Sequence, residues 1–127
     1  MIFAKLIINI LTYKTCQFGK FCIIFASETF MKIINACKLY DFVAEMPDAE
    51  TAINRWVNIV TDTNWSNHND LKRTFLSADY VGNSRYVFNI RGNNYRLVAV
   101  VVFFAGYVDI RFIGKHIDYD RIDCSKI

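Results

Sequence analysis

Apolar residues at helical spacing follow residue 35. One helix face is predicted from positions at i, i+3, i+4 and i+7, which are Leu39, Phe42, Val43 and Met46. Pro47 ends this helix and opens a second, because proline suits a first helical turn but not a helix interior. The second helix carries an apolar stripe made of Ala49, Ile53, Trp56, Val57 and Val60. The two segments predict a helical hairpin with a shared apolar face.

Period-two alternation replaces the helical spacing in the second half of the chain. Strands are predicted at Met31–Asn35, Ser84–Ile90, Tyr95–Phe104 and Tyr107–Ile113. Ser66 is expected to cap a third, short helix before the last three strands. Glycine-containing turns join those three strands into an antiparallel meander with an apolar centre. The fold class is therefore α+β: an N-terminal strand, added at the sheet edge, and a helical hairpin pack on a small antiparallel sheet.

Strand alternation also predicts which side chains share a face. In the last strand Asp109, Arg111 and Ile113 fall on one face, and Ile110 and Phe112 on the other. Arg85 and Arg96 likewise stand on strands beside apolar neighbours. If the helices cover one face, these arginines gather on the exposed one. The alternative is that each is an ordinary half-exposed strand residue.

The first 30 residues allow three interpretations. No apolar run reaches the roughly 18 residues of a membrane span, because Lys5 and the polar "TYKTCQFGK" divide the segment. It also lacks the small-residue cleavage site of a signal peptide. A genuine extra element remains possible. We favour a dispensable or mis-called extension over residues 1–30, with the functional domain at 31–127, since "MKIINACKLYDF" opens directly on a strand.

Charge is divided unevenly along the chain. Residues 31–71 carry three basic and six acidic residues (−3), whereas residues 72–127 carry nine basic and five acidic residues (+4). The basic half is rich in arginine, whose planar fork matches phosphate oxygens, so it is compatible with a polyanionic partner or with a solvated surface. The four cysteines lack metal-ligand spacing and predict free thiols in a reducing cytoplasm, with neither a metal nor a cofactor.

Two quoted stretches then identify a family. "RYVFNIRGNNYRLV" followed by "IRFIGKHIDYDRI" resembles the HigB family of bacterial toxins, a branch of the RelE-like superfamily. "MPDAETAINRWVNIVTDTNW" and "DLKRTFLSADYVGNSR" are similar to the helical half of that family. The resemblance covers Met31 to the C-terminal residue. One departure is Lys115, where the family usually has a small polar residue, and it adds a positive charge next to His116.

The resemblance implies a cytoplasmic, ribosome-dependent mRNA endoribonuclease of a type II toxin–antitoxin system. Its partners would be mRNA on the ribosome, the ribosome itself and a cognate helix-turn-helix antitoxin similar to HigA, with no membrane involved. A rival interpretation is a non-catalytic module that binds RNA, the ribosome or an antitoxin. A third is a degenerate toxin, inactivated by its extension or by Lys115.

Metal-free RNA cleavage uses the 2′-hydroxyl of the substrate as nucleophile. We assign proton transfer to His116, because an unperturbed histidine titrates near pH 6.5. Arg111 and Arg96 would clamp the scissile phosphate, and Tyr119 would stack on a base or donate its hydroxyl. The expected RNA contacts are Arg85, Arg91, Lys115, Lys72 and Arg73. Otherwise these are surface or packing residues, as His68 is expected to be, while Trp56 and Trp65 are expected in the core.

Overall fold

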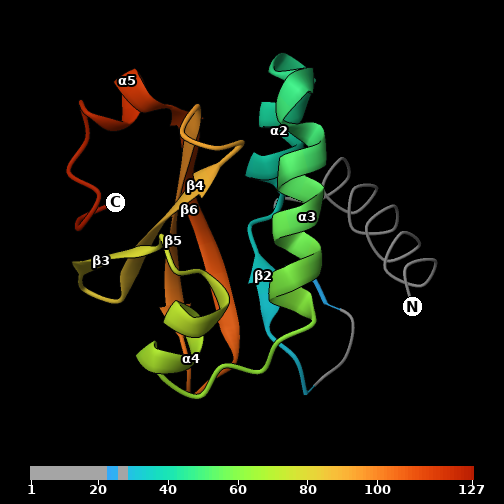
Figure 1. Cartoon of the computed structure of the whole chain (residues 1–127), viewed down its shortest axis with the longest axis vertical. Coiled ribbons are helices and arrows are strands. Elements are labelled where there is room, and N and C mark those ends of the chain that lie inside the picture. The colour runs from blue at the N-terminus through green and yellow to red at the C-terminus, as the bar shows by residue number, and fades with distance from the viewer. Residues whose placement is uncertain (1–22, 26–28) are drawn as a thin grey trace.

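The computed structural model describes residues 23–25 and 29–127 of the chain. One six-stranded sheet runs in the order β1-β2-β6-β5-β4-β3. Helices α2 and α3 lie against one face, and the C-terminal segment lies on the other side (Figure 1). The bounds are β1 Ile23–Ile24, β2 Lys32–Ile34, α2 Cys37–Glu45, η1 Pro47–Ala49, α3 Glu50–Thr61, α4 His68–Thr74, β3 Asp79–Gly82, β4 Arg85–Ile90, β5 Tyr95–Val102, β6 Tyr107–Lys115 and α5 His116–Tyr119. The α+β class is confirmed.

The predicted helical pair is present, with a short 3₁₀ turn between its members. Pro47 begins that turn, η1, and α3 follows directly. The α3 stripe is buried as expected: Ile53, Trp56 and Val60 are at most 3% exposed. Trp56 packs edge-on against Phe88 of β4, with ring centroids 5.3 Å apart. Aromatic pairs of this kind fix α3 to the centre of the sheet.

The meander of β4, β5 and β6 is confirmed, and β2 joins it in parallel beside β6. Two strands were not predicted. β3 forms a hairpin with β4 through Asn83 and Ser84, whose φ angles of 52° and 64° are those of a two-residue type I′ turn. β1 pairs antiparallel with the outer side of β2, and Ile24 is 1% exposed. The predicted dispensability of residues 1–30 stays a prediction, since most of that segment lies outside the described residues.

The cap of α4 is Asn67, so the prediction of Ser66 was wrong by one position. The Asn67 side chain accepts a hydrogen bond from the Asp70 amide, and Asp70 accepts one from the Ser66 amide. The Ser66 hydrogen bond, followed by the Arg73 guanidinium, holds the pKa of Asp70 below its usual value. This reciprocal arrangement satisfies amides that the first helical turn leaves without partners.

Asn67→Ala is therefore expected to destabilise the folded chain by about 1 kcal/mol, the usual cost of losing an N-cap. Urea unfolding measures the change against wild type. Asn69→Ala, two residues further along the chain and outside the cap, is the matched control. Its stability is expected to stay within about 0.5 kcal/mol of wild type. Equal stability of wild type and Asn67→Ala would contradict the assignment of the cap.

A β-bulge at Arg111 changes the faces of β6. Phe112 pairs with Val98, but Ile110 pairs with Ala99, so Arg111 has no partner across the ladder. The alternation predicted for this strand is therefore wrong beyond the bulge: Ile113 packs with the core under the helices, on the side of Ile110. Phe112 lies on the opposite face.

Gly114 continues β6 and does not turn the chain. The strand runs to Lys115, and β5 ends at Val102, two residues earlier than predicted. A Cβ atom on Gly114 would meet the Phe112 ring at 2.6 Å, so any side chain at this position would displace that ring. His116 therefore emerges directly from a paired strand.

The prediction of free thiols fails at Cys37, which is disulfide-bonded. Cys124 is a free cysteine, as expected. Disulfides are rare in a reducing cytoplasm, so the bonded Cys37 removes the support that the cysteines gave to that compartment.

Candidate functional site

The C-terminal segment covers the face on which the arginines were expected to be exposed. Val87 and Val98 belong to this face, since their strand neighbours Phe88 and Leu97 point into the core under the helices. Both valines are nevertheless buried, at 3% and 0% exposure. Residues after β6 run across this side of the sheet (Figure 1). The prediction of an open basic face is therefore wrong for the part of the sheet that they cover.

Arg85 is the main anchor of this segment. Its Nε and Nη2 donate to the main-chain oxygen of Ile127 at 2.9 and 2.6 Å, and its Nη1 donates to the Asn83 carbonyl at 2.7 Å. The Asn83 side chain donates to the Ser125 carbonyl at 3.0 Å. The guanidinium is thus engaged within the protein.

Arg96 and Tyr119 meet under the C-terminal segment. The guanidinium carbon of Arg96 lies 5.8 Å from the centroid of the Tyr119 ring, a cation–π distance. Arg96 Nε is buried and has no hydrogen-bond partner among the described residues. The register places Arg96 opposite Gly114, two residues before His116. Because Gly114 has no side chain, the Arg96 side chain has room to lie close to the end of β6.

Tyr119 has a hydroxyl that stays protonated near neutral pH. Burial, with a 3.5 Å contact to the Cys124 sulfur as the second cause, raises the pKa of Tyr119 to about 12. The nearby positive charge of Arg96 opposes the shift but does not cancel it. Tyr119 can therefore donate a hydrogen bond or a proton, and it is a poor base at physiological pH.

His116 forms a pair with a carboxylate that sequence reasoning missed. His116 Nδ1 lies 3.2 Å from the Asp120 carboxylate, one turn later, with side chains 44% and 57% exposed. The His116 and Tyr119 rings are 6.4 Å apart in an edge-to-face arrangement. A carboxylate at this position orients the imidazole. The i, i+4 spacing of His116 and Asp120 is the sequence signal that could have found this pair.

Arg111 stands apart from this cluster. Its guanidinium pairs with Asp109 at 3.1 Å, and the Asn35 side chain donates to the same carboxylate at 2.6 Å. Arg111 precedes Gly114 by three residues, about 10 Å along an extended strand. Arg96, His116 and Tyr119 are thus brought together, whereas Arg111 is held by its own partner.

The remaining predicted RNA contacts divide between the two ends of the sheet. Lys115 ends β6, opposite Tyr95, and Arg91 follows Ile90 on the same row, where it pairs with Asp48 at 3.0 Å. Lys72 and Arg73 stand on α4, far from this row. Lys72 donates to two carbonyls that follow α4, and Arg73 pairs with Asp70. Of these four cations, only Lys115 and Arg91 flank His116.

Within residues 23–25 and 29–127, no three His, Cys, Asp or Glu side chains gather where they would hold a metal ion. No helix in this part of the chain is long and apolar enough to cross a membrane.

Known proteins match the part of the chain that carries the candidate site. Residues 49–122, more than half of the chain, match a family model described as HigB toxin, a RelE-like toxic component of a toxin–antitoxin system. A curated relative, the mRNA interferase HigB of Escherichia coli O6:H1, is 23% identical over 94 residues. The alignment spans 72% of this chain and 91% of the relative. The matched span contains every predicted site residue from Lys72 to Tyr119.

Proposed function

Because this chain belongs to the HigB toxin family of RelE-like toxins, we propose that it is an endoribonuclease that cuts mRNA on the ribosome and so inhibits translation. The observation that supports this most directly is the cluster of Arg96, His116 and Tyr119 at one end of the sheet. It combines a cation, an imidazole and a protonated hydroxyl. Transfer of a phosphoryl group between two oxygens of one RNA strand requires these three functions.

In the proposed reaction, the 2′-oxygen forms a bond to phosphorus as the bond to the leaving 5′-oxygen breaks. One proton leaves the 2′-hydroxyl, and one reaches the 5′-oxygen. His116 transfers one of these protons, and Asp120 positions its ring. Tyr119 donates its hydroxyl or stacks on a base. Arg96 neutralises the negative charge that grows on the phosphoryl oxygens.

The other cations take different parts in this proposal. Arg111 joins the phosphate clamp only by exchanging Asp109 for the RNA, since that carboxylate is its present partner. Arg91 and Lys115 contact the RNA backbone beside the cluster, and Lys72 and Arg73 contact it farther away. Arg85 was expected to assist with RNA. Two of its hydrogen bonds, both to the main-chain oxygen of Ile127, give it a second task, which is to hold the C-terminal segment against the sheet.

Membership of this family implies an antitoxin, and we propose a helix-turn-helix protein similar to HigA. Co-expression of the gene adjacent to this one tests that identity. A small helix-turn-helix product that restores growth supports the proposal. A neighbour without this effect argues against it.

Induction of the chain in bacterial cells tests the activity itself. Primer extension on total mRNA is expected to show new 5′ ends inside reading frames. Purified chain is expected to produce the same ends on ribosome-bound mRNA and much less cleavage on free mRNA. Lower translation without new 5′ ends would point to a non-catalytic binding module. Equal cleavage of free mRNA would contradict ribosome dependence.

A chain that starts at Met31 is expected to arrest growth as full-length chain does, because every proposed site residue follows Met31. It is also expected to unfold more easily. Ile24 is buried and pairs through β1 with β2, and losing one buried isoleucine costs about 1.5–3 kcal/mol. Side-by-side induction and urea unfolding measure the two effects. A folded but harmless Met31 chain would show that residues 1–30 contribute to activity, and arrest by that chain alone would show that they inhibit it.

A further inference from the structure

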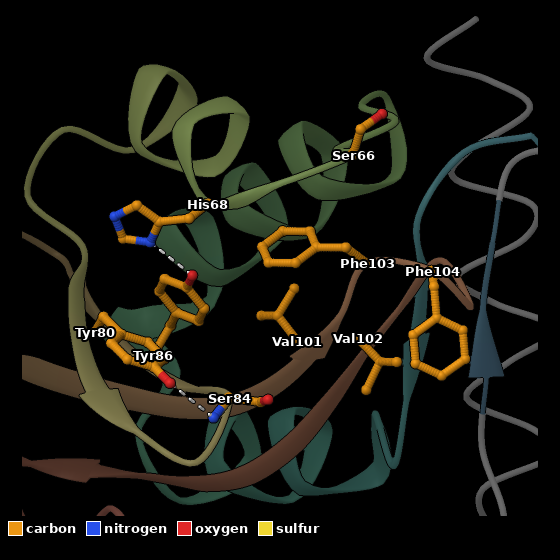
Figure 2. A pocket seen from close by; sticks show the side chains of 9 residues that line it. All are labelled: Ser66, His68, Tyr80, Ser84, Tyr86, Val101, Val102, Phe103 and Phe104. Carbon is orange, nitrogen blue, oxygen red and sulfur yellow. Dashed lines mark hydrogen bonds between the residues drawn. The ribbon is translucent and has the colours of Figure 1, made fainter.

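A cavity of about 660 Å³ opens at the end of the sheet away from His116 (Figure 2). It lies between the start of α4, the β3–β4 hairpin and the end of β5. Val102, which lines it, pairs with the first residue of β6, whereas His116 follows the last. The two regions are therefore roughly 25 Å apart along an extended strand. The cavity is not part of the proposed cleavage site.

Five aromatic side chains line the cavity, and four of them contact one another. The His68 ring is tilted by only 30° from that of Tyr86, at 5.6 Å, and His68 Nδ1 lies 2.7 Å from the Tyr86 hydroxyl. Tyr80 lies 5.1 Å from Tyr86, and Phe103 stands edge-on to Tyr86 at 6.2 Å. Figure 2 shows these rings arranged around one opening. Contacts between rings fix their orientation before any ligand arrives.

The lining contains no Lys, Arg, Asp or Glu side chain. Burial, and next the neighbouring Tyr80, raises the pKa of Tyr86, so its hydroxyl is neutral near pH 7. A phosphate or carboxylate would find no lysine or arginine here. The lining instead suits an uncharged, flat group that stacks on aromatic faces.

Hydroxyl groups accompany the rings, contributed by Ser66, Ser84 and Tyr80. The Ser84 amide donates to the Tyr80 hydroxyl at 3.4 Å. An apolar side chain from a protein partner would strip water from these groups without replacing its hydrogen bonds, which is costly. A nucleobase has both a face for stacking and a polar edge for the hydroxyls. Large exposed apolar side chains at the opening mark it as a binding surface: Phe104 is 97% and Tyr80 is 53% exposed.

We propose that this cavity binds one nucleobase of single-stranded RNA, outside the cleavage site. The inference rests on the proposed RNA target and adds a second contact with RNA that does not depend on charge. Lys72 and Arg73, on the same helix as His68, would contact the RNA backbone on either side of the bound base.

Aromatic NMR spectra of the full chain, titrated with the four ribonucleosides and their 5′-monophosphates, test the proposal. At least one nucleoside is expected to shift the His68 and Tyr80 signals in a saturable way. Its monophosphate is expected to bind within about threefold of the same affinity, with little dependence on salt. Tyr80→Leu is expected to weaken binding about tenfold, because stacking supplies a large share of base affinity.

Two matched variants complete the test. Tyr80→Phe keeps the ring and is expected to retain binding within a few-fold, and Leu76→Ala removes an exposed apolar side chain outside the cavity without effect.

Shifts with N-acetyl-leucine amide but with no nucleoside would overturn the proposal in favour of a protein anchor. Much tighter, salt-sensitive binding of the monophosphates would also overturn it. Cleavage in induced cells is scored separately, so a chain that cuts mRNA but binds no nucleoside refutes the cavity alone.

Discussion

Alanine at position 116 is expected to lower the rate of mRNA cleavage by about 10²- to 10⁴-fold, the usual contribution of a positioned acid–base group. The fold is expected to survive, because the His116 side chain is 44% exposed and its ion pair is with a neighbour one turn away. Ribosome-bound mRNA cleavage by purified chains measures the rate. Urea unfolding of the same samples separates loss of chemistry from loss of structure.

Two further substitutions make the test specific. Leu76→Ala removes an exposed side chain outside both the cluster and the cavity and is expected to leave cleavage within a few-fold of wild type. Asp120→Asn keeps the size of the His116 partner but not its charge, and it is expected to cause a smaller loss than His116→Ala. Full activity of a folded His116→Ala chain would remove His116 from the mechanism.

Local patterns predicted the elements well because their causes are local. The α3 stripe repeats at helical spacing, and the apolar run of β5 is flanked by turn residues. β3 escaped prediction because "DYVG" is short and polar at its start, and its pairing depends on an Asn83–Ser84 turn with positive φ angles. β3 therefore forms because it pairs with β4 across that turn, although its own sequence is a weak strand former.

The candidate site was predicted as a set of residues but not as an arrangement. His116, Tyr119 and Arg96 come together because β5 and β6 pair, which the meander already implied. The position of Arg111 depends on a bulge of one residue, which alternation does not reveal. The Arg85 guanidinium is hydrogen-bonded to a residue 42 positions away, and a contact between such distant positions leaves no local pattern in the sequence. The covered face is therefore a property of tertiary packing.

Arg96→Ala is the second substitution with a large expected effect, a fall in cleavage rate of about 10²- to 10³-fold. A preorganised donor aimed at developing charge in a site shielded from water typically contributes this much. Arg96 meets that description, since its Nε is buried without a partner among the described residues and Tyr119 covers its guanidinium. Single-turnover cleavage with saturating ribosome complexes measures the chemical step apart from binding.

Arg96→Lys and Asn89→Ala make the result interpretable. Lysine keeps the charge but loses the planar fork, so partial activity is expected. Asn89 is the neighbour of Arg96 across β4 and β5, and its loss tests the strand pair without removing a cation. If Arg96→Ala cuts mRNA normally while Arg111→Ala does not, the phosphate is held by Arg111 alone, after Arg111 has given up its ion pair with Asp109. If both single variants lose activity and the double variant loses no more, the two guanidiniums act on the same phosphate as one clamp.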